Sequence, residues 1–182
     1  EHIPPRSCFN SLPAKPVSGD ALINSMSQDK RKPWDTSGLT YKNQQSGMGM
    51  WSLCVECNSN TGSWYGNDYY DFIQNVNHII VTHDVQAGGQ LRFQMNDIFP
   101  LRIIKQMVSM VCSINQSLFE DERIKTLADF VKNRDVTGID KDKYRIIMYV
   151  ARNKYSKLCP LTVLFKKGNA NNPIYLEVVS EI

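Results

Sequence analysis

The sequence holds one close cysteine pair, Cys54 and Cys57, which constrains the local fold more than any other feature. Two intervening residues let both thiols face one point from a tight turn, which is the knuckle of a tetrahedral zinc site. The apolar residues before the pair, such as Met48, Met50 and Trp51, predict a short strand that enters this knuckle. The same spacing also occurs in redox dithiols, and two unligated thiols are a further alternative.

The composition sets limits on the class of protein. A chain of 182 residues suits one domain, or a small domain with an appendage, and 42% hydrophobic residues are enough for a core. No apolar run approaches the roughly 20 residues of a membrane-spanning helix, so we expect no membrane insertion. The net charge of +3 is too small to indicate a nucleic-acid partner by itself. Five cysteines with only one close pair argue against a disulfide framework and favour a reducing compartment, the cytoplasm.

Residues 1–47 are interrupted by prolines and glycines and show little regular periodicity. A stretch of this length without secondary structure is uncommon in a compact domain unless something other than a core holds it in place. A bound metal ion is one explanation, and disorder in part of residues 17–47 is the other.

Helical periodicity follows the cysteine pair. The spacing of apolar residues predicts helices over about 67–77, 97–116 and 121–133, and residues 78–83 form either a short strand or a helix end. The middle helix has a proline in its first turn, where the missing donor does no harm. Apolar residues cover so much of its circumference that we expect a largely buried helix, with Cys112 as a core thiol.

The end of the chain is rich in β-branched and aromatic residues. Runs over 144–150, 161–165 and 174–179, separated by polar loops, predict a short antiparallel sheet. The order of knuckle, helices and strands predicts an α+β fold.

A second motif makes the cysteine pair more informative. Residues 1–5 read Glu-His-Ile-Pro-Pro, and Asn58 directly follows Cys57. This combination resembles the HNH family of metal-dependent endonucleases, and in particular bacterial members with a zinc knuckle. In that family an acidic residue and a histidine end the first strand, and a Cys-x-x-Cys followed by His or Asn begins the helix.

The resemblance implies a division of the chain. A small ββα-metal module would occupy residues 1–66, and an α+β appendage with a helical segment and a short antiparallel sheet would occupy residues 67–182. Because the sequence lacks an initial methionine and ends within a predicted strand, we expect a fragment of a longer protein, with the module truncated at its N-terminus.

The resemblance also implies a chemistry, the hydrolysis of phosphodiester bonds in DNA. His2 would act as the general base, and Glu1 and Asn58 would hold a catalytic Mg²⁺ or Mn²⁺. Cys54 and Cys57 would hold a separate structural zinc. Oxygen ligands suit a hard ion, whereas thiolates suit zinc, which agrees with this division of labour.

Two other functions fit the same residues. A non-catalytic binding module, clamped by zinc or free of metal, would recognise nucleic acid or protein; Gly49 favours it, because the family has its central asparagine at this position. A thiol-dependent redox protein is suggested by the cysteine pair alone, and an ordinary thiol pKa at Cys54 would exclude it. The oligomeric state is left open by the sequence.

Overall fold

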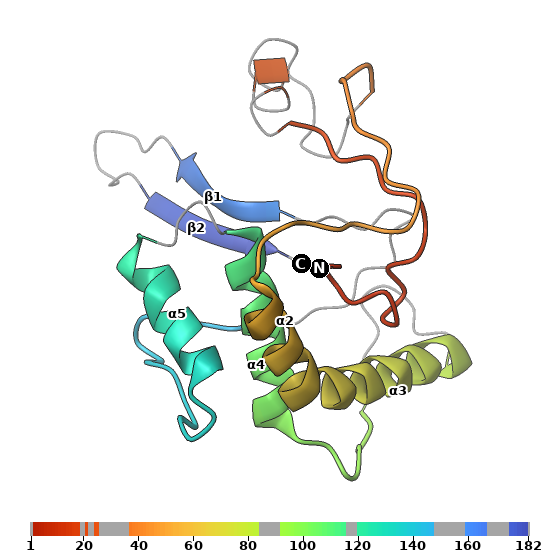
Figure 1. Ribbon diagram of the computed structural model, residues 1–182, viewed down its shortest axis with the longest axis vertical. Coiled ribbons are helices and arrows are strands. Elements are labelled where there is room, and N and C mark those ends of the chain that lie inside the picture. The colour runs from red at the N-terminus through yellow and green to blue at the C-terminus, as the bar shows by residue number, and fades with distance from the viewer. Residues whose placement is uncertain are drawn as a thin grey trace. The chain divides into compact units, whose positions relative to one another are not determined.

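The computed structural model describes residues 2–18, 21, 24–25, 37–83, 92–115 and 120–147 with their side chains, and residues 159–166 and 175–181 as backbone strands (Figure 1). The chain divides into two compact units, Glu1–Trp51 and Ser52–Ile182. The boundary falls within the module predicted over residues 1–66. His2 therefore belongs to the first unit and Cys54 to the second.

The first unit is held together by short pairings between its two ends. Isolated antiparallel bridges join His2 to Gly49, Ala14 to Gln44 and Val17 to Tyr41. These bridges do not extend into a strand anywhere in the described residues of this unit.

Asn10 fastens the two ends of the first unit with its side chain. Its amide nitrogen donates to the carbonyl oxygens of Pro4 at 2.6 Å and Met48 at 2.8 Å, and its amide oxygen accepts from the Met48 N–H at 2.7 Å. Gly47 adopts a φ of +83°, and a Cβ there would lie 2.0 Å from the Asn10 carbonyl oxygen. Only glycine fits this close approach.

The second unit begins with one continuous helical run (Figure 1). It consists of α2 (Val55–Thr61), the π-helical turn η1 (Gly62–Gly66) and α3 (Asn67–His83). The residues predicted as a strand or helix end over 78–83 thus continue α3. A π-helical turn inside an α-helix is rare, and such turns occur frequently at functional sites.

Two further helices complete the described core. These are α4 (Pro100–Ile114) and α5 (Glu122–Lys132), and both confirm predicted helices. α4 contacts η1, α3 and α5. It is buried along most of its length, as expected, and Cys112 is a core thiol that is 4% exposed.

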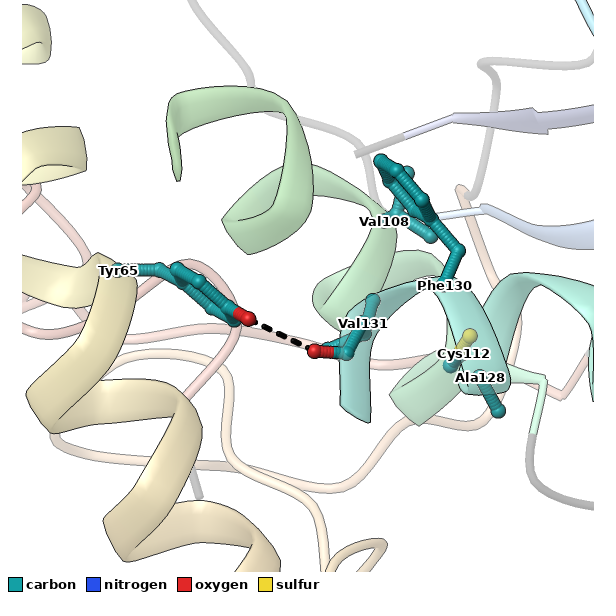
Figure 2. Close-up of a cluster of buried hydrophobic side chains, with 6 residues drawn as sticks. All are labelled: Tyr65, Val108, Cys112, Ala128, Phe130 and Val131. Carbon is teal, nitrogen blue, oxygen red and sulfur yellow. Dashed lines mark hydrogen bonds between the residues drawn. The ribbon is translucent and has the colours of Figure 1, made fainter. Parts of the chain in front are cut away.

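The core lies where η1, α4 and α5 meet (Figure 2). Its buried members are Tyr65, Val108, Cys112, Ala128, Phe130 and Val131. The Tyr65 hydroxyl donates a buried hydrogen bond of 2.8 Å to the carbonyl oxygen of Val131. This carbonyl is in the last turn of α5, where no backbone N–H of the helix is available to it. The bond therefore satisfies a polar group within the core.

Two strands follow, β1 (Cys159–Lys166) and β2 (Tyr175–Glu181). They pair antiparallel, with Val163 opposite Val178.

The predicted α+β class, a ββα-metal module followed by a helical segment and an antiparallel sheet, was wrong. The part of the chain described with its side chains is helical and contains no strand. The predicted strand before the cysteine pair does not form: in this stretch Gly49 makes an isolated bridge to His2, and the residues around it are irregular. Tyr144 to Ile147, the described part of a third predicted strand, is irregular, and residues 148–150 lie outside the described residues.

A membrane-spanning helix is also not found. Among the described residues, none of the helices combines the necessary length with the necessary apolar content.

Candidate functional site

The cysteine pair lies at the beginning of a helix rather than on a strand-bound knuckle. Cys54 is the N-cap of α2, with an extended backbone at φ −65° and ψ 161°, and Cys57 is in the first turn. The Cys54 sulfur accepts a hydrogen bond of 3.3 Å from the Cys57 backbone N–H. Cysteine here takes the place of the serine or aspartate that usually caps a helix.

This geometry shifts the pKa values of the two thiols in opposite directions. The hydrogen bond from the Cys57 backbone N–H stabilises the thiolate and lowers the pKa of Cys54 below its usual value. The hydrogen bond with Cys54 raises the pKa of Cys57, and partial burial raises it further. Cys54 is exposed, so the more acidic thiol is also the more accessible one. An exposed thiol of lowered pKa is the nucleophilic member of a dithiol and the better metal ligand.

Asn58 extends the same turn. Its backbone N–H donates to the Cys54 carbonyl oxygen at 3.0 Å, and the residue is exposed. Its carboxamide is therefore next to the cysteine pair and open to a ligand.

His2 is held on a fixed backbone in the first unit. The neighbouring Ile3 is completely buried, and its N–H donates to the Met48 carbonyl oxygen at 3.0 Å. The Nδ1 atom of His2 is buried and has no hydrogen-bond partner among the described residues. Burial lowers the pKa of His2, and the nearby Arg6 lowers it further. The imidazole is therefore neutral at neutral pH.

The predicted site residues are thus found in two places. Cys54, Cys57 and Asn58 lie together at the start of α2, His2 lies in the other unit, and Glu1 lies outside the described residues.

A metal site requires enough ligand side chains close together, and the described residues can be searched for such groups. In the described part of the chain no group of three or more His, Cys, Asp or Glu side chains could hold an ion. The two thiols supply half of the four ligands of a structural zinc, and Asn58 supplies one oxygen for a hard ion. The described residues do not complete either site, and no chemical step below is routed through a metal.

A second feature, a charged cleft in the second unit, was missed by the sequence analysis. The cleft has a volume of about 360 Å³, and its walls are formed by Trp64, Tyr65, Leu101, Arg102, Lys105, Arg134 and Asp135. A wider groove of about 790 Å³ shares Trp64 and Arg134 with it. Lys105 was the available signal, because lysine is rarely buried and this one lies in a helix that was predicted to be largely buried.

Comparisons of the chain with protein-family models, curated proteins and solved structures found no match. The resemblance to HNH endonucleases therefore rests on residues 1–5 and on the Cys54–Asn58 motif.

Proposed function

We propose that the chain is an HNH-like module that hydrolyses phosphodiester bonds of DNA, with His2 as the general base. The observation that supports this proposal is the state of His2, which combines a fixed backbone with a neutral imidazole and an unpartnered buried nitrogen. A buried side-chain nitrogen without a partner is uncommon, and such groups often have a catalytic or ligand-binding role.

In the proposed reaction His2 removes one proton from the attacking water molecule. A neutral imidazole has one nitrogen with a free lone pair, which takes a proton from water as the water oxygen attacks phosphorus. The hydrogen bonds from Ile3 and Asn10 to Met48 hold the backbone beside His2 in place. The residue therefore loses little conformational freedom in the reaction step.

The remaining parts of the proposal come from the resemblance. The resemblance implies that Glu1 and Asn58 would hold a Mg²⁺ or Mn²⁺ and that Cys54 and Cys57 would hold a structural zinc. A cytoplasmic location belongs to the same proposal, because the cysteines would then stay reduced.

Nicking of supercoiled plasmid DNA in Mg²⁺ or Mn²⁺ tests the proposal. His2→Ala is expected to abolish nicking, and His83→Ala, which changes an exposed histidine at the end of α3, is expected to leave it unchanged. The rate should fall at acid pH with a midpoint below the ordinary histidine pKa of about 6.5, since burial and Arg6 lower the pKa of His2. Equal nicking by the wild type and His2→Ala would refute the role of His2.

A second candidate function, dithiol–disulfide exchange, is favoured by the lowered pKa of Cys54. The Cys54 thiolate would attack a substrate disulfide and form a mixed disulfide. The Cys57 thiolate would then attack the Cys54 sulfur, releasing the substrate as a dithiol and leaving an oxidised Cys54–Cys57 bond. The two electrons pass from the cysteine pair to the substrate.

Trapping distinguishes this function from the first. With a disulfide substrate such as oxidised glutathione, Cys57→Ser should accumulate the mixed disulfide at Cys54, whereas Cys54→Ser should not. Cys112→Ser is the matched control, because it removes a buried thiol. Mass spectra without any mixed disulfide in Cys57→Ser would exclude this candidate.

A further inference from the structure

Lys105 is a buried cation in the second unit. Its side chain is 1% exposed, and its ammonium group donates to the carbonyl oxygens of Asn133 at 2.5 Å and Arg134 at 3.3 Å. The rings of Phe130 and Tyr65 lie 4.9 and 5.8 Å from it. No carboxylate of the described chain forms an ion pair with it. Buried charges are usually neutralised by a partner of opposite charge, so this ammonium is unusual.

The two carbonyl contacts satisfy only part of the hydrogen-bonding capacity of the Lys105 ammonium group. They place positive charge beside the C-terminus of α5, which is favourable, because the last carbonyls of a helix carry partial negative charge. An ammonium group has three donors, and the two carbonyl oxygens occupy two of them. Lys105 is among the residues that line the cleft, so its positive charge lies behind the wall, and Asp135 is the carboxylate that acts on it.

Most of the other charged residues around the cleft are also positive. Arg102 and Arg134 line it with Lys105, and Asp135 is the one carboxylate among the lining residues. Arg102 forms an ion pair of 3.1 Å with Asp68 outside the cleft. In the described part of the chain Arg134 forms no ion pair. The cleft therefore has an excess of positive charge.

The wall of the cleft also carries an aromatic ring. Trp64 is half-buried, and the guanidinium of Arg134 lies over its ring at 5.5 Å from the centroid. A guanidinium held over a ring keeps its N–H donors for a phosphate, and the fork of these donors matches two phosphate oxygens. A cleft of about 360 Å³ is within the usual range for small-ligand sites, about 300–1,000 Å³.

We propose that this cleft binds one backbone phosphate of a DNA strand, with Arg134 on the phosphate oxygens, the buried charge of Lys105 behind them and Trp64 beside the adjacent nucleotide. The choice of DNA rests on the proposed function, whereas the choice of a phosphate rests on the charges of the cleft. Such a contact would position the substrate without reading its sequence.

Binding in the absence of hydrolysis tests the site. The anisotropy of a fluorescein-labelled single-stranded oligodeoxynucleotide is measured in EDTA, where metal-dependent cleavage cannot proceed. Arg134→Gln should weaken binding about tenfold and lower the slope of log K against log salt by about 1. Lys125→Gln is the matched control, because it removes one positive charge from the first turn of α5, where Lys125 pairs with Glu122. It should change the affinity less than twofold, which is about the measurement error.

Arg102→Gln serves as a second variant, and thermal unfolding establishes that both variants are folded. Folded Arg134→Gln and Arg102→Gln proteins that bind as tightly as the wild type would overturn the site. Displacement of the oligonucleotide by inorganic phosphate at an equal phosphate concentration would overturn the assignment to a DNA strand.

The outcome is separable from that of the proposed function. If Arg134→Gln loses binding in EDTA, and His2→Ala binds normally in EDTA but does not nick in Mg²⁺, both proposals stand. If the wild type nicks and Arg134→Gln binds unchanged, the cleft is refuted and the nuclease stands. If the wild type never nicks and Arg134→Gln loses binding, the nuclease is refuted and the cleft stands.

Discussion

At the scale of single residues, two polar side chains hold the C-terminus of α5 against the core. The Tyr65 hydroxyl donates a hydrogen bond to the carbonyl oxygen of Val131. The Lys105 ammonium donates to the carbonyl oxygens of Asn133 and Arg134. The carbonyls of Val131 and Asn133 are unsatisfied in an isolated helix, and Arg134 directly follows the C-cap of α5. The core therefore depends on polar contacts at the same place where it buries its apolar side chains.

Tyr65→Phe isolates one of these contacts. The ring still fills its place, but the buried Val131 carbonyl loses its donor, so we expect a loss of about 1–3 kcal/mol in the free energy of unfolding. Urea denaturation measures it, and Tyr70→Phe, at an exposed position on α3, should be nearly neutral. Equal stabilities for the two variants would show that the hydrogen bond contributes nothing.

Thiol reactivity gives a second prediction at this scale. Burial raises the pKa of Cys112 to about 12, whereas the pKa of the exposed Cys54 is lowered. Because the thiolate is the reactive species, iodoacetamide at neutral pH should alkylate Cys54 first and Cys112 only after unfolding in urea. Peptide mapping by mass spectrometry reads both sites. Early alkylation of Cys112 in the native protein would contradict its place in the core.

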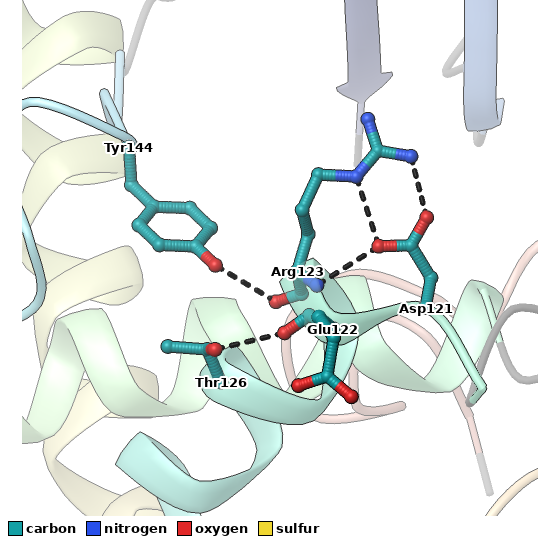
Figure 3. Close-up of polar contacts among 5 residues, drawn as sticks. All are labelled: Asp121, Glu122, Arg123, Thr126 and Tyr144. Carbon is teal, nitrogen blue, oxygen red and sulfur yellow. Dashed lines mark hydrogen bonds and ion pairs between the residues drawn. The ribbon is translucent and has the colours of Figure 1, made fainter.

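At the scale of elements, the start of α5 is capped by the side chain of the residue before it, Asp121 (Figure 3). The Asp121 carboxylate accepts from the backbone N–H of Arg123 at 2.8 Å and forms an ion pair with its guanidinium. The Tyr144 hydroxyl donates to the Arg123 carbonyl oxygen at 3.0 Å, and so ties the irregular segment after α5 back to the helix.

The Asp121 cap predicts a pH dependence. The hydrogen bonds from Arg123 lower the pKa of Asp121 from 3.8 to about 2. Since the folded value is the lower one, its contribution to stability is complete above the unfolded pKa and is lost as the pH falls from 3.8 towards 2. Asp121→Asn keeps a capping oxygen without the charge, so its unfolding midpoint should fall less over this range. Asp142→Asn, at an exposed position, should follow the wild type.

Local patterns in the sequence predicted α4, α5 and most of α3. Pro100 and the apolar spacing after it predicted α4, and its burial followed from apolar residues around its circumference. The run from Ile79 to Thr82 is β-branched and resembles a strand, yet it continues α3, because a helix that has already begun adds each further residue at little cost.

Contacts between distant residues could not be read from the sequence. The bridge from His2 to Gly49 and the fastening by Asn10 depend on the fold rather than on local periodicity. The same holds for the cleft, where Trp64 and Arg134 come from different segments. The cysteine pair was recognised at once, but its position as a helix cap was not, since cysteine is not a usual capping residue.

At the scale of the whole molecule, the proposed zinc makes a prediction about composition. If Cys54 and Cys57 are zinc ligands, elemental analysis of the purified chain should find about one zinc per chain and none in Cys57→Ser. EDTA should then lower the thermal midpoint of the wild type but not that of the variant. A wild-type chain without zinc would remove the structural metal from the proposed function and leave the dithiol candidate unaffected.

The π-helical turn η1 sets the phase between the two ends of the helical run. Because an α-helix advances about 100° per residue, deleting one residue of Gly62–Gly66 and restoring regular α-helix would rotate α2 by about that angle relative to α3. The Cys54–Asn58 motif would then face a different direction, although no atom of the motif had changed. The direction in which this motif is presented is thus encoded by the length of a turn that contains none of its residues.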